Sequence, residues 1–161
     1  MLRRLTLLCG ASIGFAAVGL PQEGVRVSGP ALIEARQASL DMSSIAFRAM
    51  GDAMKAGREA KSQGYPAAVL AKWARALPRM FPSGTGKDET STNSQALSAI
   101  WEDRAGFDRA AANYADATAR LAALAAANDS VGFTRQLEEV DRACSSCHAR
   151  YKEGAQGPPK N

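Results

Sequence analysis

Two cysteines and a histidine close to the end of the chain, in the order Cys144-Ser-Ser-Cys147-His148, restrict the folds that this sequence can adopt. A helix turns by about 100° per residue, so the three side chains leave one helical face. C-x-x-C-H is the attachment pattern of a c-type haem, in which each cysteine bonds one vinyl group and the histidine reaches the iron. A haem is a large planar group, so other parts of the chain must cover the face of it that lies opposite the histidine.

Other uses of the same residues are less well supported by the sequence. A thioredoxin-like dithiol would need a βαβ setting, and a zinc site would need a fourth protein ligand. His148 is the one histidine of the chain, and the third cysteine, Cys9, lies in an N-terminal segment that we expect to be removed. Covalent haem is therefore favoured, with a redox dithiol or plain surface cysteines as alternatives. A single histidine also excludes bis-histidine ligation within one chain.

The N-terminus has the pattern of a secretory signal peptide. Two arginines precede a mostly apolar run over residues 5–20, which is short for a membrane span. Ala17 and Gly19 are small residues that suit a cleavage site, so we expect residues 1–19 to be removed and the mature protein to reside in the periplasm. An uncleaved anchor is the alternative. Covalent haem attachment in bacteria takes place outside the inner membrane, so the two independent features agree on the compartment.

The charge of the chain excludes one class of partner. The formal net charge is +4, of which the signal peptide carries two arginines. No basic stripe with interleaved aromatic residues is present, so we expect no nucleic-acid partner, and no membrane contact after signal cleavage.

Apolar residues that recur every three or four positions predict four helices, and no strand pattern separates them. Prolines, glycines and capping residues mark the helix ends. After the signal peptide we expect a flexible leader (20–30) and a helix over Ala31–Lys55. A second helix starts at Gly64-Tyr65-Pro66 and is kinked or ended by Pro78, and a surface loop follows over Pro82–Asn93. The third helix covers Ser94–Ala127, and the last helix is capped by Asn128-Asp129-Ser130 and frays at Gly154. We predict one all-α domain over residues 31–155, an antiparallel up-down-up-down four-helix bundle with covalently bound haem, followed by a disordered tail over 156–161.

The first helix supplies the candidate second wall of the haem site. Arg36 and Gln37 share a face with Leu40, because they precede it by four and three residues. An arginine can pair with a haem propionate, a glutamine can hydrogen-bond at the haem edge, and a leucine presents only methyl groups to the iron. The alternative is a surface Arg-Gln pair beside a core leucine.

Several motifs together resemble the cytochromes c′, in an order that covers the chain from about Ala31 to Lys152. They are the C-terminal C-x-x-C-H, Arg36-Gln37-x-x-Leu40, Phe81-Pro82 with its glycine-rich loop, and Ile100-Trp101-x-Asp103 with Phe107. The resemblance implies a four-helix bundle around a covalently bound haem c. It also implies that Trp101 and Phe107 belong to the core, whereas Trp73 is assigned either to the core or to a dimer surface.

The resemblance also assigns roles to single residues. Cys144 and Cys147 become the thioether sites and His148 the one axial ligand of the iron. Leu40 becomes the apolar residue on the opposite, distal side. Arg36 and Gln37 lie near the propionates, and Lys152 matches a basic residue beside the axial histidine.

An iron with one protein ligand is five-coordinate and binds a small molecule without displacing a side chain. Leucine offers no hydrogen bond, so dioxygen gains little, whereas NO and CO bind ferrous iron largely through covalent terms. The resemblance implies the same: a non-enzymatic periplasmic gas-binding protein, thought to protect against NO, with electron transfer to a redox partner a less settled role. Family members often form homodimers through their first two helices.

A second hypothesis is a low-spin electron carrier with a methionine on the first helix as sixth ligand. Met42 lies about 200° around the helix from Leu40, and Met50 and Met54 lie about 15 Å and 21 Å along it. None replaces Leu40, so this hypothesis is less favoured. A peroxidase-like enzyme would need a distal histidine and arginine, and the sequence has no second histidine.

Overall fold

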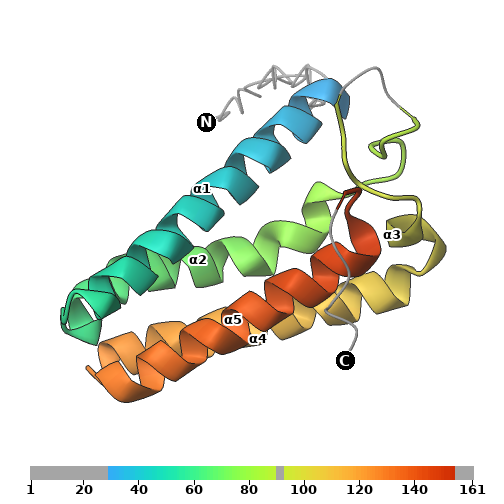
Figure 1. Cartoon of the computed structure of the whole chain (residues 1–161). Coiled ribbons are helices and arrows are strands. Elements are labelled where there is room, and N and C mark those ends of the chain that lie inside the picture. Colours follow the sequence, from blue (N-terminus) through green and yellow to red (C-terminus); the bar gives the residue numbers. More distant parts are fainter. Residues whose placement is uncertain (1–28, 90–92, 155–161) are drawn as a thin grey trace, which may run out of the picture.

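The structure, a computed structural model, describes residues 29–89 and 93–154 (Figure 1). The predicted signal peptide, most of the leader and the whole predicted C-terminal tail lie outside the described residues. The helices are α1 (Gly29–Lys55), η1 (Ala60–Gln63), α2 (Gly64–Ala76), η2 (Leu77–Met80), α3 (Ala99–Glu102), α4 (Arg104–Ala126) and α5 (Ser130–Tyr151).

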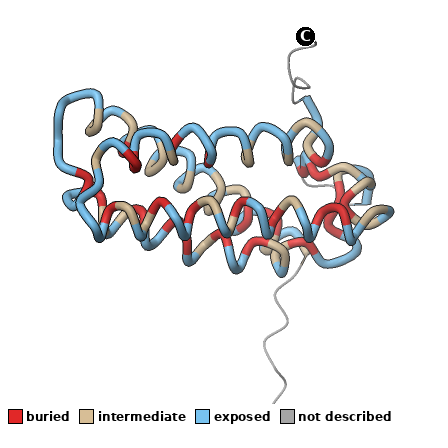
Figure 2. Tube along the Cα trace, turned by 90° about the horizontal axis from the view of Figure 1, so that it is seen from below, coloured by how far each residue is buried: buried red, intermediate tan, exposed pale blue. Residues whose placement is uncertain are grey.

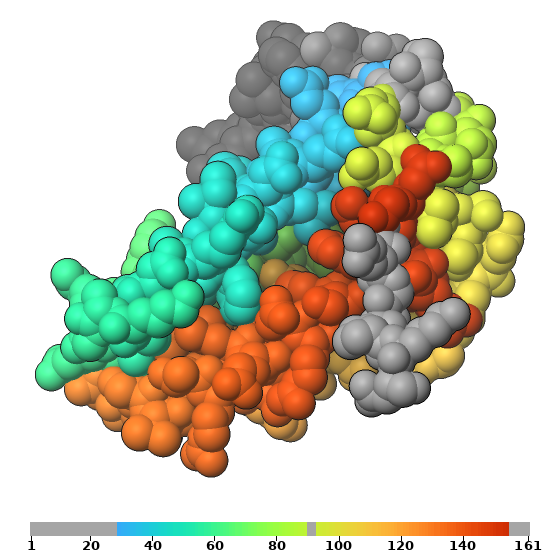
Figure 3. Space-filling model, in the orientation of Figure 1, coloured from blue at the N-terminus to red at the C-terminus, as the bar shows by residue number. Residues whose placement is uncertain are grey.

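The four long helices alternate in direction and form the predicted up-down-up-down bundle (Figure 1). Helix α4 packs extensively against α2 and α5, whereas α1 packs mainly on α2 and less on α5. In the view of Figure 1, the C-terminal end of α1 lies near the N-terminal end of α5, and the two helices diverge toward their other ends. The surface is hollowed between α1 and α5 (Figure 3). No helix of the described part is long and apolar enough to cross a membrane.

The core follows the predicted apolar stripes. On α1, Ile33 is buried, and Leu40, Phe47 and Met54 are partly buried against the core. Buried residues recur along the inner sides of the helices (Figure 2). They include Phe107, Tyr114 and Leu121 on α4, and Phe133, Leu137 and Val140 on α5.

The predicted single helix over Ser94–Ala127 is wrong at its N-terminal end. Residues 94–98 are not helical, and α3 is separated from α4 at Asp103, which has φ −121° and ψ 59°. The segment before α3 instead bonds to the end of α5: Ala96 pairs with Lys152 in an isolated antiparallel bridge, and the Leu97 N–H donates to the Tyr151 carbonyl over 3.1 Å. Asp103 caps α4 by accepting from the Gly106 N–H over 3.0 Å. The interruption of the apolar rhythm across Arg104 was the sequence sign of this break.

The remaining helix ends agree better with the sequence. Helix α2 ends at Ala76, and Pro78 lies in the first turn of η2, so the proline ends the α-helix as predicted. Asp129 caps α5 by accepting from the Gly132 N–H over 2.8 Å. The short helix η1 was not predicted.

Candidate haem site

Helix α5 continues through the C-x-x-C-H motif and places Cys147 and His148 at a cavity that α1 also lines. Cys144 and Cys147 are half-buried against the core, whereas His148 is exposed. The two cysteines do not form a disulfide with each other. The helix ends three residues after His148, at Tyr151, so the motif lies in its last turns.

Six of the seven predicted site residues line one cavity of about 110 Å³, and they come from opposite sides of it. Helix α1 contributes three of them, Arg36, Gln37 and Leu40. The end of α5 and the residue after it contribute the others, Cys147, His148 and Lys152. The seventh residue, Cys144, lies one turn back on α5. The structure therefore brings residues near the start of α1 and at the end of α5 to one cavity.

The remaining walls of this cavity come mostly from residues that the sequence did not single out. They are Leu77, Phe81, Gln95, Ala96, Ile100, Phe107 and Tyr151. Phe107 was predicted as a core residue, and it both belongs to the core and lines the cavity. Trp101 does not line it. Trp73 is half-buried against the core, and its indole N–H is buried with no acceptor in the described part of the chain.

Arg36 is a buried cation, with only 2% of its surface exposed. Its Nη1 donates to the Met80 carbonyl and to Thr85 Oγ1, both over 3.1 Å. Its Nη2 donates to the Thr85 carbonyl over 3.0 Å and to Ser94 Oγ over 3.1 Å. The guanidinium also lies 4.2 Å from the centre of the Phe81 ring. Gln37 acts similarly at the surface, because its side-chain amide donates to the Asn93 carbonyl over 2.7 Å.

No carboxylate pairs with Arg36 among the described residues, although burying an unpaired charge is costly. Burial accordingly lowers the pKa of Arg36 from its ordinary value. Its four outer N–H groups hold the loop that follows η2. It can therefore act on an anion in the cavity mainly through its charge and not through a bidentate bond.

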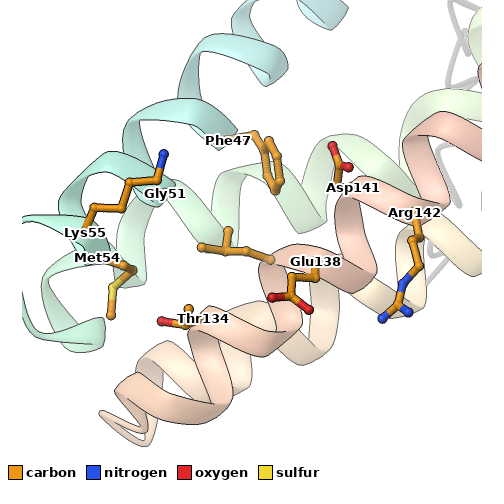
Figure 4. A pocket seen from close by; sticks show the side chains of 9 residues that line it. Phe47, Gly51, Met54, Lys55, Thr134, Glu138, Asp141 and Arg142 are labelled. Atoms are coloured by element: carbon orange, nitrogen blue, oxygen red, sulfur yellow. The ribbon is translucent and has the colours of Figure 1, made fainter.

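A larger cavity of about 530 Å³ lies further along α1 and α5, toward Lys55 (Figure 4). Phe47 and Met54 of α1 and Leu137 of α5 are among its apolar walls, and Asp141 and Glu138 lie on its α5 side. No predicted site residue lines it. We place the functional site in the smaller cavity because that is where the ligand-forming side chains meet.

Comparison with known proteins identifies the family. The family described as Cytochrome C' matches residues 31–152, which is most of the chain. The chain belongs to the cytochrome c′ family. It is 28% identical over 123 residues to cytochrome c′ of Rhodospirillum rubrum, covering 76% of this chain and 82% of that protein. It is 31% identical over 102 residues to a cytochrome c-554 of Cereibacter sphaeroides, covering 63% and 61%.

Solved structures of cytochromes c′ share the fold. Cytochrome c′ from Rubrivivax gelatinosus superimposes with a TM-score of 0.70 at 25% identity, over 78% of this chain and 97% of that one. A nitric oxide complex of a cytochrome c prime mutant from Alcaligenes xylosoxidans gives 0.69 at 22% identity, over 78% and 96%. The family implies a covalently bound haem c.

The residues of this cytochrome c′ fit such a group. Two thiols and an imidazole share one face of α5, and an apolar side chain, Leu40, lines the cavity from the other helix. The buried charge of Arg36, with Lys152 at the same cavity, gives the positive potential that two carboxylates of a haem require. The donor set and the unpaired cation therefore both match the group that the family implies.

Burial sets the protonation of the motif. It raises the pKa of the Cys144 thiol to about 11, with smaller contributions from Asp141 and Cys147, and it also raises the pKa of Cys147. His148 has much of its surface exposed, but partial desolvation of its ring at the cavity, and then the charge of Lys152, lower its pKa. The neutral imidazole, which is the form that binds a metal, is therefore favoured at neutral pH.

Proposed function

We propose that this cytochrome c′ binds NO and CO at a haem iron that has His148 as its one protein ligand and Leu40 on its open side. The observation that carries the proposal is that Leu40 and His148 line one cavity from opposite helices. When bound, the haem supplies an iron centre that takes up a diatomic gas. Solved relatives from Alcaligenes xylosoxidans were determined as nitric oxide complexes, which supports the choice of gas.

Each residue of the site then has a defined task. Cys144 and Cys147 hold the haem through thioether bonds, and the neutral ring of His148 ligates the iron. Leu40 keeps water away from the iron and offers no hydrogen bond, so a polarised ligand such as dioxygen gains little. Arg36 and Lys152 attract the propionates. Apart from the two thioether bonds, no covalent step is assigned to these residues, and we propose a non-enzymatic protein.

The distribution of methionines favours gas binding over the alternative of a His/Met electron carrier. No methionine of the described part lines the cavity that contains His148. Met42 is 63% exposed, Met50 is buried in the core, and Met54 lines the other cavity. We propose protection against NO in the periplasm as the physiological role, with exchange of electrons with a redox partner as the second role. The cytochrome c-554 relatives are the reason to retain the second.

Absorption spectra of the mature holoprotein, ferric and ferrous, before and after addition of CO and NO, test the proposal. We expect a high-spin ferrous spectrum that changes when either gas is added. A low-spin spectrum that does not respond to CO, with a methionine-to-iron charge-transfer band in the ferric form, would overturn it and establish the electron carrier.

We also propose that the protein is a homodimer in which α1 pairs with α1 of the partner subunit. An apolar seam runs along the outer face of α1 with alternating steps of three and four residues, the spacing of a coiled coil. Its members are Ala35, Ala38, Met42, Ile45 and Ala49, all exposed, and Met42 and Ile45 are 63% and 64% exposed. Alanines at most positions allow two backbones to approach closely.

Charged residues beside this seam specify an antiparallel pair. Glu34, Asp41, Arg48 and Lys55 are spaced by seven residues and lie on one side of the seam, with the acids in its first half and the bases in its second. A two-fold axis that brings Met42 against Ile45 of the partner subunit sets Asp41 beside Arg48 of the partner subunit. The same axis sets Glu34 beside Lys55 of the partner subunit. Such self-complementarity is what a symmetric dimer requires.

A further inference from the structure

The carboxylate of Asp103 joins the start of α4 to the turn that carries His148. Its Oδ1 accepts from the Gly106 N–H over 3.0 Å, which caps α4. Its Oδ2 accepts from Arg150 Nη2 over 2.7 Å and from the Tyr151 hydroxyl over 3.4 Å. Arg150 and Tyr151 are the second and third residues after His148. One side chain therefore connects two helix ends that are almost fifty residues apart.

The packing beside this carboxylate leaves no room for a side chain at Gly106. A Cβ on Gly106 would lie 2.0 Å from Asp103 Oδ2 and 2.7 Å from the Tyr151 hydroxyl oxygen, so only glycine fits there. The Tyr151 ring meets the Phe107 ring edge-to-face, with centroids 5.4 Å apart. The end of α5 is thus held at a fixed distance from α4.

The last turn of a helix frays easily unless groups outside the helix hold it, and here the Leu97 N–H holds the Tyr151 carbonyl from the segment before α3. Here that turn carries the candidate axial ligand, and His148 itself is exposed and makes no side-chain hydrogen bond to the described residues that would fix its ring. The direction of the imidazole therefore depends on the backbone of residues 148–151. Asp103 is the side chain that ties this backbone to α4.

We propose that Asp103 is a positioning residue of the haem site, which holds the last turn of α5 so that His148 points at the iron in one orientation. The inference rests on the proposed function, because it takes His148 as the axial ligand. Asp103 does not touch the haem in this proposal. It acts through Arg150 and Tyr151.

The chain contains a matched control for the capping role of this residue. Asp129 stands in the same Asp-x-x-Gly pattern at the start of α5, and its Oδ1 accepts from the Gly132 N–H over 2.8 Å. A Cβ on Gly132 would likewise meet the Asp129 carboxylate, at 2.3 Å. Asp129 forms no ion pair among the described residues, and it lies about 28 Å along the helix from His148. Asparagine caps helices as well as aspartate does, so Asn at either position keeps the cap.

The experiment compares the holoproteins of wild type, D103N and D129N in the ferrous state by resonance Raman spectroscopy. We expect the iron–histidine stretching band to shift and broaden in D103N and to be unchanged in D129N, with similar midpoints of thermal unfolding for both variants. An exposed ion pair contributes little to global stability, so the effect is local to the turn.

One further variant keeps the test decisive. R150Q removes the guanidinium that donates to Asp103 Oδ2 over 2.7 Å and keeps Asp103 as the cap of α4. We expect the iron–histidine band of R150Q to shift in the same direction as that of D103N, but by less. If D103N does not fold, R150Q decides whether Asp103 positions His148. An unchanged band in both D103N and R150Q, or equal shifts in D103N and D129N, would overturn the positioning role. Absence of any iron–histidine band in the wild type would instead refute the proposed ligation by His148.

Discussion

The two faces of α1 carry apolar residues at similar spacing, but one face packs against the core of its own chain and the other is exposed. On the inner face, Leu40 and Phe47 are seven residues apart and pack against the core of their own chain. On the outer face, Met42 and Ile45 are more than 60% exposed. A period of seven residues reveals that a helix has an apolar face, but the packing of the other helices decides what covers it. The inner face meets the haem cavity, and we propose that the outer face meets a second copy of the chain.

The largest effect is expected from a substitution that tests whether Leu40 faces the iron, by placing an iron ligand at position 40. In L40M the thioether would lie across the cavity from His148. We expect a low-spin spectrum and loss of CO binding at concentrations that saturate the wild type, measured by absorption spectroscopy. M42L on the outer face is the control and should leave the spectrum unchanged. A high-spin L40M protein with wild-type CO uptake would show that Leu40 does not face the iron.

The next effect concerns the buried charge on the inner face. R36A removes four hydrogen bonds from the guanidinium. It leaves Thr85 Oγ1 without a donor, and the Thr85 carbonyl and Ser94 Oγ each lose one of their two donors. We expect a loss of about 3 kcal/mol in the free energy of unfolding, measured by urea titration of the holoprotein. R48A, on the outer face, should change it by less than about 0.5 kcal/mol. Equal losses in the two variants would contradict the difference between the faces.

The proposed dimer contact on the outer face of α1 can be disrupted by substitutions that leave the inner face unchanged. Replacing Met42 and Ile45 together by lysine puts four like charges at the centre of the proposed antiparallel seam. We expect the dimer to weaken by at least about 100-fold, a change of roughly 2.7 kcal/mol, as measured by sedimentation equilibrium. The CO difference spectrum should stay that of the wild type. A double variant that still sediments as a dimer would exclude this surface as the interface.

The smallest predicted effect tests the register of the two helices. R48D sets two pairs of like charges against Asp41 across the two-fold axis, and we expect about tenfold weaker dimerisation in low salt. D41R combined with R48D restores opposite charges and should recover most of the affinity. If the double variant is as weak as R48D alone, the proposed register is wrong.

Much of the site could be predicted from local spacing. Cys144 and His148 share a face because they are four residues apart on a helix, and Arg36 and Leu40 do so for the same reason. The apolar period of the four helices predicts the bundle, and the bundle together with the motifs indicates the family. These inferences succeed because helical geometry relates only residues within one or two turns of each other.

The partners of those residues could not be predicted in the same way. The hydrogen bonds of Arg36 reach residues 44 to 58 positions away, and those of Asp103 reach the end of α5. No local period relates such residues. The start of the third long helix was misplaced for the same reason, because the backbone before α3 bonds to residues 151–153 instead of forming a helical turn.

The sequence by itself determined the haem-attachment pattern, the four amphipathic helices and the residues that face inward, because each follows from a repeat along the chain. Only the tertiary structure decided that Arg36 is buried beneath the loop it holds, that α3 and α4 separate at Asp103, and that Asp103 ties the turn of His148 to α4. These features depend on groups that meet only when the helices pack. The free energy of a buried charge, or of a carboxylate that bonds two helix ends, depends on the groups that helix packing brings into contact with it and not on its neighbours in sequence.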